Sequence, residues 1–301
     1  MNMKVDLCGV TLNNPVMTAS GTFGSGAEYA EFVDLNKLGA VVTKGVANVP
    51  WPGNPTPRVA EVYGGMLNAV GLQNPGFDLF VERDIPFLKQ FDTKIMVNVC
   101  GHSTEEYIEV VERLRDQPVD LLEINISCPN VKEGGIAFGQ DPKAVEAITK
   151  EMKKHAAQPV IMKLSPNVTD ITEMARAAEA GGADGLSLIN TITGMKIDIN
   201  RQKFVLANKT GGMSGPAIHP VAVRMVYQTA QAVSIPIVGM GGIMNAEDAI
   251  EMILAGATAV SVGTANFTNP HVTEEIVAGI RDYMERYQVA DIRDLVGAVH
   301  E

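Results

Sequence analysis

A thiol follows an apolar run near the middle of the chain, in the sequence Asn125-Ile126-Ser127-Cys128-Pro129-Asn130. Pro129 has no backbone N–H to donate and restricts the residue before it, so a strand over residues 121–126 must end here. Cys128 is therefore expected on a loop just beyond a strand end, where a thiol can act as a nucleophile or as a general acid or base. The same pattern also fits a small, half-buried apolar residue, which is a common role of cysteine. These six residues leave both interpretations open.

Polar side chains end several other apolar runs of the chain. They are Ser20, Lys44, Asn98, Asn125, Lys163, Asn190 and Thr191. Taken singly, an asparagine or serine often satisfies the backbone of a turn, and a lysine often extends to solvent. Their repetition at equivalent places indicates a shared polar pocket instead.

Glycine-containing pairs, Gly241-Gly242 and Gly263-Thr264, follow the last two apolar runs. Glycine turns before a helix can bind phosphate through backbone N–H groups, and the Gly212 to Gly215 stretch offers further donors. Tight turns without a ligand are the alternative. A phosphate-bearing cofactor here would bring a flat, electron-rich ring close to the polar strand ends. Lys163 would then compensate the negative charge of a reduced flavin, and Asn98 and Asn125 would bond the ring edge.

Short β-type runs alternate with amphipathic helical stretches along the chain. The eight runs are 16–19, 40–44, 94–99, 121–126, 160–164, 185–189, 236–240 and 259–262, and helical stretches include 104–115, 142–155, 172–180 and 246–255. Most runs are continuously apolar, as in parallel strands buried on both faces. The pattern predicts an α/β fold, a (β/α)8 barrel, as one domain over residues 1–301. A doubly wound open sheet is the alternative, and it is disfavoured because no Gly-x-Gly-x-x-Gly motif follows the first run.

Three connections are longer than is usual between a strand and a helix, namely 46–75, 131–140 and 191–216. All three follow strands, so they are expected on the carboxyl-terminal face of the barrel, where barrel enzymes have their active sites. Three glycines in 131–140 predict a mobile lid, and apolar runs at 197–199 and 204–206 predict an extra hairpin. Residues 4–11 predict a small hairpin outside the barrel.

Composition excludes several classes of protein. The chain has 301 residues, 46% of them hydrophobic and a net charge of −11, so a large core is expected, and nucleic acid and anionic membranes are poor partners. Cys8, Cys100 and Cys128 lack the spacing of a disulfide framework or a zinc site, and the histidines are scattered. No apolar run approaches the ~20 residues of a membrane span, and no signal peptide is evident. A reduced, cytoplasmic protein is expected.

The chain resembles the dihydroorotate dehydrogenases over nearly its whole length, and within them the catalytic subunit of the class 1B, NAD-linked form. The motifs that carry the resemblance are residues 19–24 (ASGTFG), 43–45 (TKG), 68–74 (NAVGLQN), 125–130 (NISCPN), 163–167 (KLSPN), 211–216 (GGMSGP) and 239–243 (GMGGI). The 190–198 loop (NTITGMKID) is similar to the 1B version.

The resemblance implies roles for individual residues. FMN phosphate would lie at Gly241, Gly242, Gly263 and Thr264 with Gly215 nearby, and the flavin would be surrounded by Ser20, Lys44, Gly45, Asn98, Asn125, Lys163 and Ile189. Substrate contacts would come from Lys44, Asn68, Ala69, Val70, Gly71, Leu72, Asn125, Asn190 and Thr191. Cys128 matches the position of the active-site base.

The expected reaction is oxidation of (S)-dihydroorotate to orotate in pyrimidine biosynthesis. Hydride would pass from C6 to FMN N5, and Cys128 would take the C5 proton. The resemblance also implies a homodimer within a heterotetramer, whose second subunit carries FAD and a 2Fe–2S cluster and passes electrons to NAD+. This chain lacks the cysteine spacing that such a cluster needs.

Four alternatives remain open at this point. Two keep the flavin: a fumarate-linked class 1A enzyme and a dihydropyrimidine dehydrogenase-like reductase. A third is an aldolase that uses Lys163 or Lys44 as a Schiff-base lysine. The last is a barrel that serves only as a binding or scaffold subunit, which would leave the polar strand ends without a use.

Overall fold

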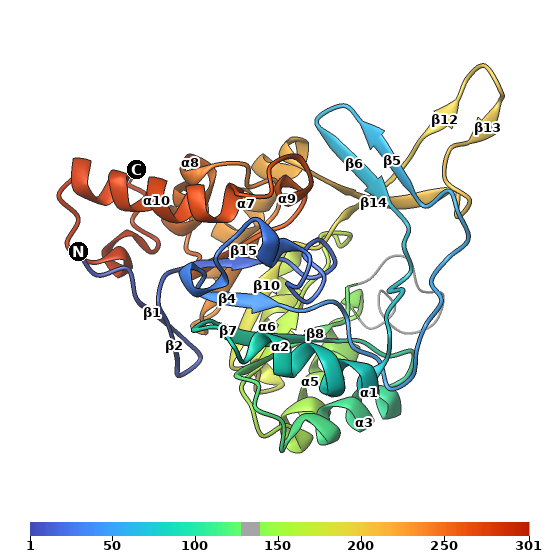
Figure 1. Cartoon of the computed structure of the whole chain (residues 1–301), viewed down its shortest axis with the longest axis horizontal. Helices are drawn as coiled ribbons and strands as arrows, with labels where there is room; N and C mark the ends of the chain where they lie inside the picture. Colours follow the sequence, from blue (N-terminus) through green and yellow to red (C-terminus); the bar gives the residue numbers. More distant parts are fainter. Residues whose placement is uncertain (128–138, 301) are drawn as a thin grey trace.

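The computed structural model describes residues 1–127 and 139–300, and its centre is a closed barrel of eight parallel strands (Figure 1). In chain order the strands are β3 (Val16–Thr18), β4 (Ala40–Val42), β7 (Lys94–Val99), β8 (Leu121–Asn125), β9 (Val160–Lys163), β10 (Gly185–Leu188), β15 (Ile237–Met240) and β16 (Ala259–Val262). Strand β16 pairs with β3 and closes the barrel. All eight predicted strands and the predicted barrel are confirmed, with strand ends that differ by at most two residues.

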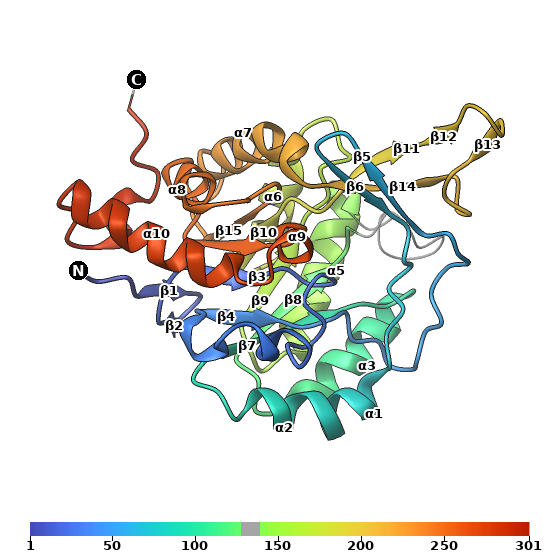
Figure 2. The same cartoon turned by 45° about the horizontal axis from the view of Figure 1, so that its top comes forward.

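Helices surround the barrel because each presents one apolar face to it (Figures 1 and 2). They are α1 (Phe77–Leu79), α2 (Ile85–Leu88), α3 (Thr104–Leu114), α5 (Pro142–His155), α6 (Ile171–Ala180), α7 (His219–Ala230), α8 (Ala246–Leu254), α9 (Ala265–Thr268) and α10 (Val272–Arg286), with a π-helical turn at Phe80–Asp84 between α1 and α2. Ser103 caps α3 by accepting a hydrogen bond from the backbone N–H of Glu106, as its position before the acidic first turn predicts.

A two-stranded hairpin, β1 (Val5–Leu7) and β2 (Val10–Leu12), lies at the amino-terminal end of the barrel. Leu7 and Leu12 are fully buried. The turn residue Cys8 packs against the first residue of β10, because a Cβ built on Gly185 would lie 2.8 Å from Cys8 Sγ. The predicted N-terminal hairpin is confirmed, and it covers that end of the barrel.

The long connections after β4 and β10 combine into a second sheet that was not predicted. Its antiparallel strands are β5 (Val59–Val62), β6 (Gly65–Asn68), β14 (Thr210–Ser214) and β11 (Ile192–Met195). Strand β6 of the first connection pairs with β14 of the second, 144 residues later at Asn68 and Gly212. This sheet holds the two insertions together over one side of the barrel (Figure 1).

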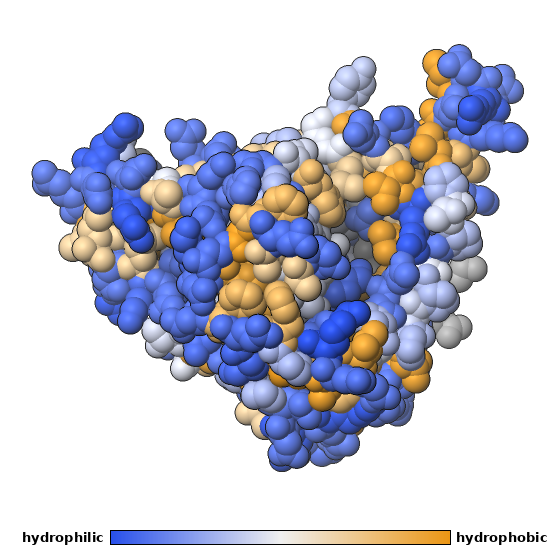
Figure 3. Space-filling view, viewed as in Figure 1, coloured by the Kyte–Doolittle hydropathy of each residue, from blue (hydrophilic) through white to orange (hydrophobic). Residues whose placement is uncertain are grey.

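The predicted extra hairpin is confirmed as β12 (Ile197–Asp198) and β13 (Lys203–Phe204), which extend outward beyond β11 and β14 (Figure 2). Its apolar side chains are exposed: Ile199 by 82%, Ile197 by 53% and Phe204 by 46%. Figure 3 shows apolar side chains on this arm and at its base. Among the described residues, no helix has both the length and the apolar character to cross a membrane.

Candidate active site

The carboxyl-terminal ends of the barrel strands and the second sheet together enclose a pocket. Of the residues proposed from the sequence, those that line it are Ser20, Lys44, Gly45, Asn68, Val70, Gly71, Leu72, Asn98, Asn125, Lys163, Ile189, Asn190, Thr191, Gly215, Gly241, Gly242, Gly263 and Thr264. Ala69 does not line the pocket, because its side chain is buried in a small apolar cluster with Leu67 and Leu206. Cys128, Pro129 and most of the 131–140 connection lie outside the described residues.

Two turns in the pocket wall have backbone conformations that favour glycine. Gly241 has φ +128° and Gly242 has φ +69°, and a Cβ on Gly242 would lie 2.7 Å from His219 Cβ. Gly215, with φ +108°, begins the 3₁₀ turn Pro216–Ile218 that leads into α7. These turns keep side chains out of this wall, so that a ligand can approach the backbone closely.

The turn after β16 is tied to the second sheet. Thr264 Oγ1 donates to Ser214 Oγ at 2.7 Å, which joins the start of α9 to the end of β14. Ser261, on β16, also lines the pocket and is 1% exposed. Its hydroxyl has no hydrogen-bond partner among the described residues, so this wall has a buried polar group available to a ligand.

A buried cation lies at the base of the pocket. Lys163 is 3% exposed, and its Nζ lies 3.1 Å from Ser20 Oγ and 3.3 Å from Glu123 Oε2. Glu123 lies in the middle of β8 and is 1% exposed, so two opposite charges are paired inside the barrel. Lysines and glutamates are almost never fully buried without such a partner.

The amides of the pocket form a connected chain of hydrogen bonds. Asn98 Nδ2 donates to Glu123 Oε2 at 2.6 Å, and Asn125 Nδ2 donates to Asn98 Oδ1 at 3.4 Å. Asn125 Oδ1 accepts from both the backbone N–H and the hydroxyl of Ser127. Asn190 Nδ2 then donates to Ser127 Oγ at 2.7 Å. Side chains from β7, β8 and the segments that follow β8 and β10 are thereby held in one arrangement beside the pocket.

Glu123, Ser187 and Ser261 were not singled out from the sequence. The available signal was the charged residue inside the apolar run 121–125, two positions before Asn125 and therefore on the same face of the strand. Strand pairing then places Asn98 opposite Glu123 and Lys163 opposite both Asn125 and Ser187. The register decides these neighbours, and the register is a property of the closed barrel.

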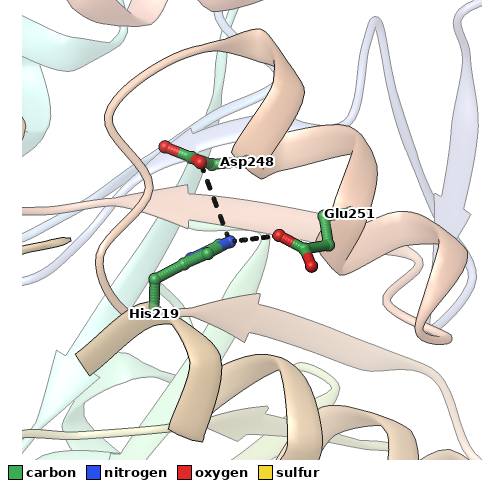
Figure 4. A group of neighbouring side chains, drawn as sticks. All are labelled: His219, Asp248 and Glu251. Carbon is green, nitrogen blue, oxygen red and sulfur yellow. Dashed lines mark hydrogen bonds and ion pairs between the residues drawn. The ribbon is translucent and has the colours of Figure 1, made fainter. Parts of the chain in front are cut away.

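Figure 4 shows a cluster of His219, Asp248 and Glu251, three residues that do not line the pocket. His219 Nδ1 lies 2.9 Å from the carbonyl oxygen of Gly241, and its Nε2 lies 3.0 Å from Glu251 Oε2. Asp248 accepts from the backbone N–H of Met244. The imidazole therefore connects α8 to the Gly241 turn. The sequence does not indicate this contact, because His219 is the first residue of α7 whereas Asp248 and Glu251 lie on α8, about 30 residues later.

Fold and site together define the class: a (β/α)8-barrel protein whose pocket combines glycine turns suited to phosphate with a buried lysine and several amides. The chain belongs to the dihydroorotate dehydrogenase family, whose model matches residues 2–284. Two relatives, both named dihydroorotate dehydrogenase B (NAD(+)), catalytic subunit, extend the match over nearly the full chain.

The first, from Lachnoclostridium phytofermentans, is 72% identical over 299 residues, 99% of this chain and 100% of the relative. The second, from Alkaliphilus metalliredigens, is 65% identical over 99% of both chains. A solved dihydroorotate dehydrogenase from Eimeria tenella, in complex with ferulenol, is similar in fold, with a TM-score of 0.81 at 22% identity over 99% of this chain and 88% of that one. The resemblance found in the sequence is thus confirmed.

Proposed function

We propose that this chain oxidises (S)-dihydroorotate to orotate with FMN bound in the pocket, as the catalytic subunit of an NAD-linked enzyme of pyrimidine biosynthesis. One observation carries the proposal. In a chain 72% identical to a catalytic subunit of that name, the glycine turns, Lys163 and the linked amides converge on a single pocket.

The residues present fit FMN. The turn at Gly241 and Gly242 and the neighbouring Gly215 leave room for a phosphate beside backbone N–H groups, and the hydroxyls of Ser261 and Thr264 lie in the same wall. Lys163 supplies a positive charge that suits a ring which gains negative charge on reduction. FMN supplies the hydride acceptor for C6 of the substrate.

The chain's own residues would bind, orient and deprotonate the substrate. We assign the substrate contacts to Lys44, Asn68, Val70, Gly71, Leu72, Asn125, Asn190 and Thr191, with Ala69 contributing at most its backbone. Holding the reactants in one orientation is itself a large part of catalysis. Cys128 is proposed as the base that takes the C5 proton.

The NAD linkage requires a partner. We propose that a second subunit carries FAD and a 2Fe–2S cluster and that two copies of this chain form the core of a heterotetramer in the cytoplasm. The exposed apolar side chains of the β12–β13 arm support such contacts, because exposed apolar patches often mark interfaces. We also propose that residues 1–301 form one domain, consistent with a family match over 2–284.

For Lys163, the aldolase alternative is disfavoured by the surroundings of the side chain. Its Nζ lies within hydrogen-bonding distance of a carboxylate and a hydroxyl, an arrangement that suits an ammonium group and not a nucleophilic amine. The fumarate-linked alternative is disfavoured by the relatives described above, which carry the NAD-linked name.

Anaerobic stopped-flow mixing of the purified yellow chain with dihydroorotate tests the proposal. The flavin absorbance should bleach, at a rate that rises with pH through a thiol pKa of about 8.5. Cys128→Ala should retain FMN but reduce it about 10²- to 10⁴-fold more slowly, because a positioned base is lost. Equal rates of flavin reduction for the wild type and Cys128→Ala would show that Cys128 is not the base.

The same preparation tests whether NAD+ reduction requires the partner subunit. The chain alone should reduce a dye but not NAD+, and co-expression with the partner subunit should restore NAD+ reduction. Rapid NAD+ reduction by the chain alone would contradict the proposed partner.

A further inference from the structure

Among the described residues, Glu123 is the one carboxylate within ion-pairing distance of Lys163. It lies between Leu122 and Ile124 on β8 and is 1% exposed. A buried ion pair contributes little net stability compared with apolar residues of the same size, because both charges lose their hydration. Packing of the barrel core therefore gives no reason for a carboxylate at this position.

The two oxygens of Glu123 have separate partners. Oε2 accepts from Asn98 Nδ2 at 2.6 Å and lies 3.3 Å from Lys163 Nζ, whereas Oε1 accepts from Ser187 Oγ at 2.8 Å. A carboxylate can only accept hydrogen bonds, so Asn98 must turn its NH2 toward Glu123 and its oxygen toward Asn125. Glu123 thus determines how two pocket-lining side chains, Asn98 and Lys163, are presented.

We infer that Glu123 is a positioning residue that holds Lys163 and Asn98 at the floor of the pocket and offsets part of the positive charge which Lys163 directs at the bound flavin. This inference rests on the proposed function, because it concerns the electrostatics of the flavin site. A carboxylate 3.3 Å from the ammonium group lowers the potential that the ammonium group produces nearby, and in a buried site such charges are poorly screened.

The consequence is that Glu123 keeps the reduction potential of the flavin lower than Lys163 alone would make it. A nearby positive charge favours the reduced, more negative form of a flavin, so an uncompensated Lys163 would raise the midpoint potential. With Glu123 in place the potential stays lower, which favours transfer of electrons onward to a weak oxidant such as a nicotinamide.

Glu123→Gln tests the inference with little steric change. The glutamine oxygen can still accept from Asn98 and Lys163, and its NH2 can donate to Ser187 Oγ, so the variant removes the charge and keeps the hydrogen bonds. Spectroelectrochemical titration of the FMN-loaded protein should show a midpoint potential shifted upward from that of the wild type. The FMN content of the purified variant should be unchanged.

Glu146→Gln is the matched control, because Glu146 pairs with Lys150 at 2.5 Å on the exposed surface of α5, outside the pocket. Its flavin potential should equal that of the wild type. A folded, FMN-loaded Glu123→Gln protein with wild-type potential would overturn the inference and leave the proposed function intact. Failure of the wild-type chain to take up FMN would overturn both.

A second variant keeps the test decisive if Glu123→Gln does not fold. The double variant Glu123→Gln/Lys163→Met removes both charges, so no uncompensated cation remains buried. It should fold, bind FMN and show a potential below that of the wild type. If the double variant fails to fold as the single one does, the pairing of Glu123 with Lys163 is not what matters, and the inference is wrong.

Discussion

At the scale of single residues, the pocket depends on backbone positions as much as on charged side chains. Gly242 combines φ +69° with a Cβ direction that points at His219, whose ring holds the carbonyl oxygen of Gly241. A left-handed backbone costs an ordinary residue about 1–2 kcal/mol, and the overlap at 2.7 Å adds to this cost. Gly242 should therefore tolerate no side chain without movement of the turn.

Gly242→Ala should weaken FMN binding by about tenfold or more, since about 1.4 kcal/mol lost from the bound state corresponds to a factor of ten. Fluorescence titration of the apoprotein with FMN measures this change. Gly182→Ala is the matched control, because Gly182 also has a positive φ, +90°, but lies outside the pocket, and its Cβ would meet only Lys153 Cγ at 3.8 Å. Equal FMN affinities for the two variants would show that the Gly242 turn does not bind the phosphate.

At the scale of elements, the β1–β2 hairpin shows how a small unit depends on the barrel. Cys8 lies at its turn with φ +57° and packs against the start of β10. Burial, followed by the charges of Asp184 and Asp6, raises the pKa of the Cys8 thiol to about 12. The folded protein therefore keeps the proton on Cys8 at pH values where an unfolded chain would release it.

The sign of the stability change follows from linkage. Because the folded pKa is raised, the contribution of Cys8 to the free energy of unfolding is fully present below the unfolded pKa, about 8.5 for an unperturbed thiol, and is lost as pH rises toward 12. Urea unfolding at pH 8 and pH 10.5 should show a smaller alkaline loss of stability for Cys8→Ala than for the wild type. Parallel pH profiles would show that Cys8 ionises equally in both states.

At the scale of the whole molecule, a ligand held by groups from both insertions and several barrel strands should stabilise the entire fold. A ligand that binds only the folded state adds about 2.7 kcal/mol at a free concentration of 100 times its Kd. Removal of FMN should lower Tm, and added FMN should restore it in a concentration-dependent way. Riboflavin is the matched ligand because it lacks only the phosphate, and it should stabilise less. Equal stabilisation by FMN and riboflavin would show that the phosphate does not contribute to binding.

Part of the fold was predictable because it depends on local pattern. The continuous apolar runs and their alternation with amphipathic helices predicted the barrel, and the helical stretch predicted at 104–115 is α3. The second sheet was not predictable in this way. Strand β6 carries Gly65 and pairs with a segment more than 140 residues away, so no local pattern determines the partner.

The candidate site, like the fold, was predictable where it depends on local sequence and unpredictable where it depends on tertiary contacts. By itself the sequence determined which residue types end the strands: Lys163, the asparagines and the glycine pairs, because strand ends follow from hydrophobic pattern and turn chemistry. The resemblance of the chain's motifs to a known family supplied the proposed roles of these residues, including that of Cys128. Only the tertiary structure decided that Glu123 pairs with Lys163 and orients Asn98, and that His219 lies behind the Gly241 turn. The physical reason is that these contacts depend on the register of the closed barrel and on the packing of α7 and α8, which bring together groups that are far apart in the chain.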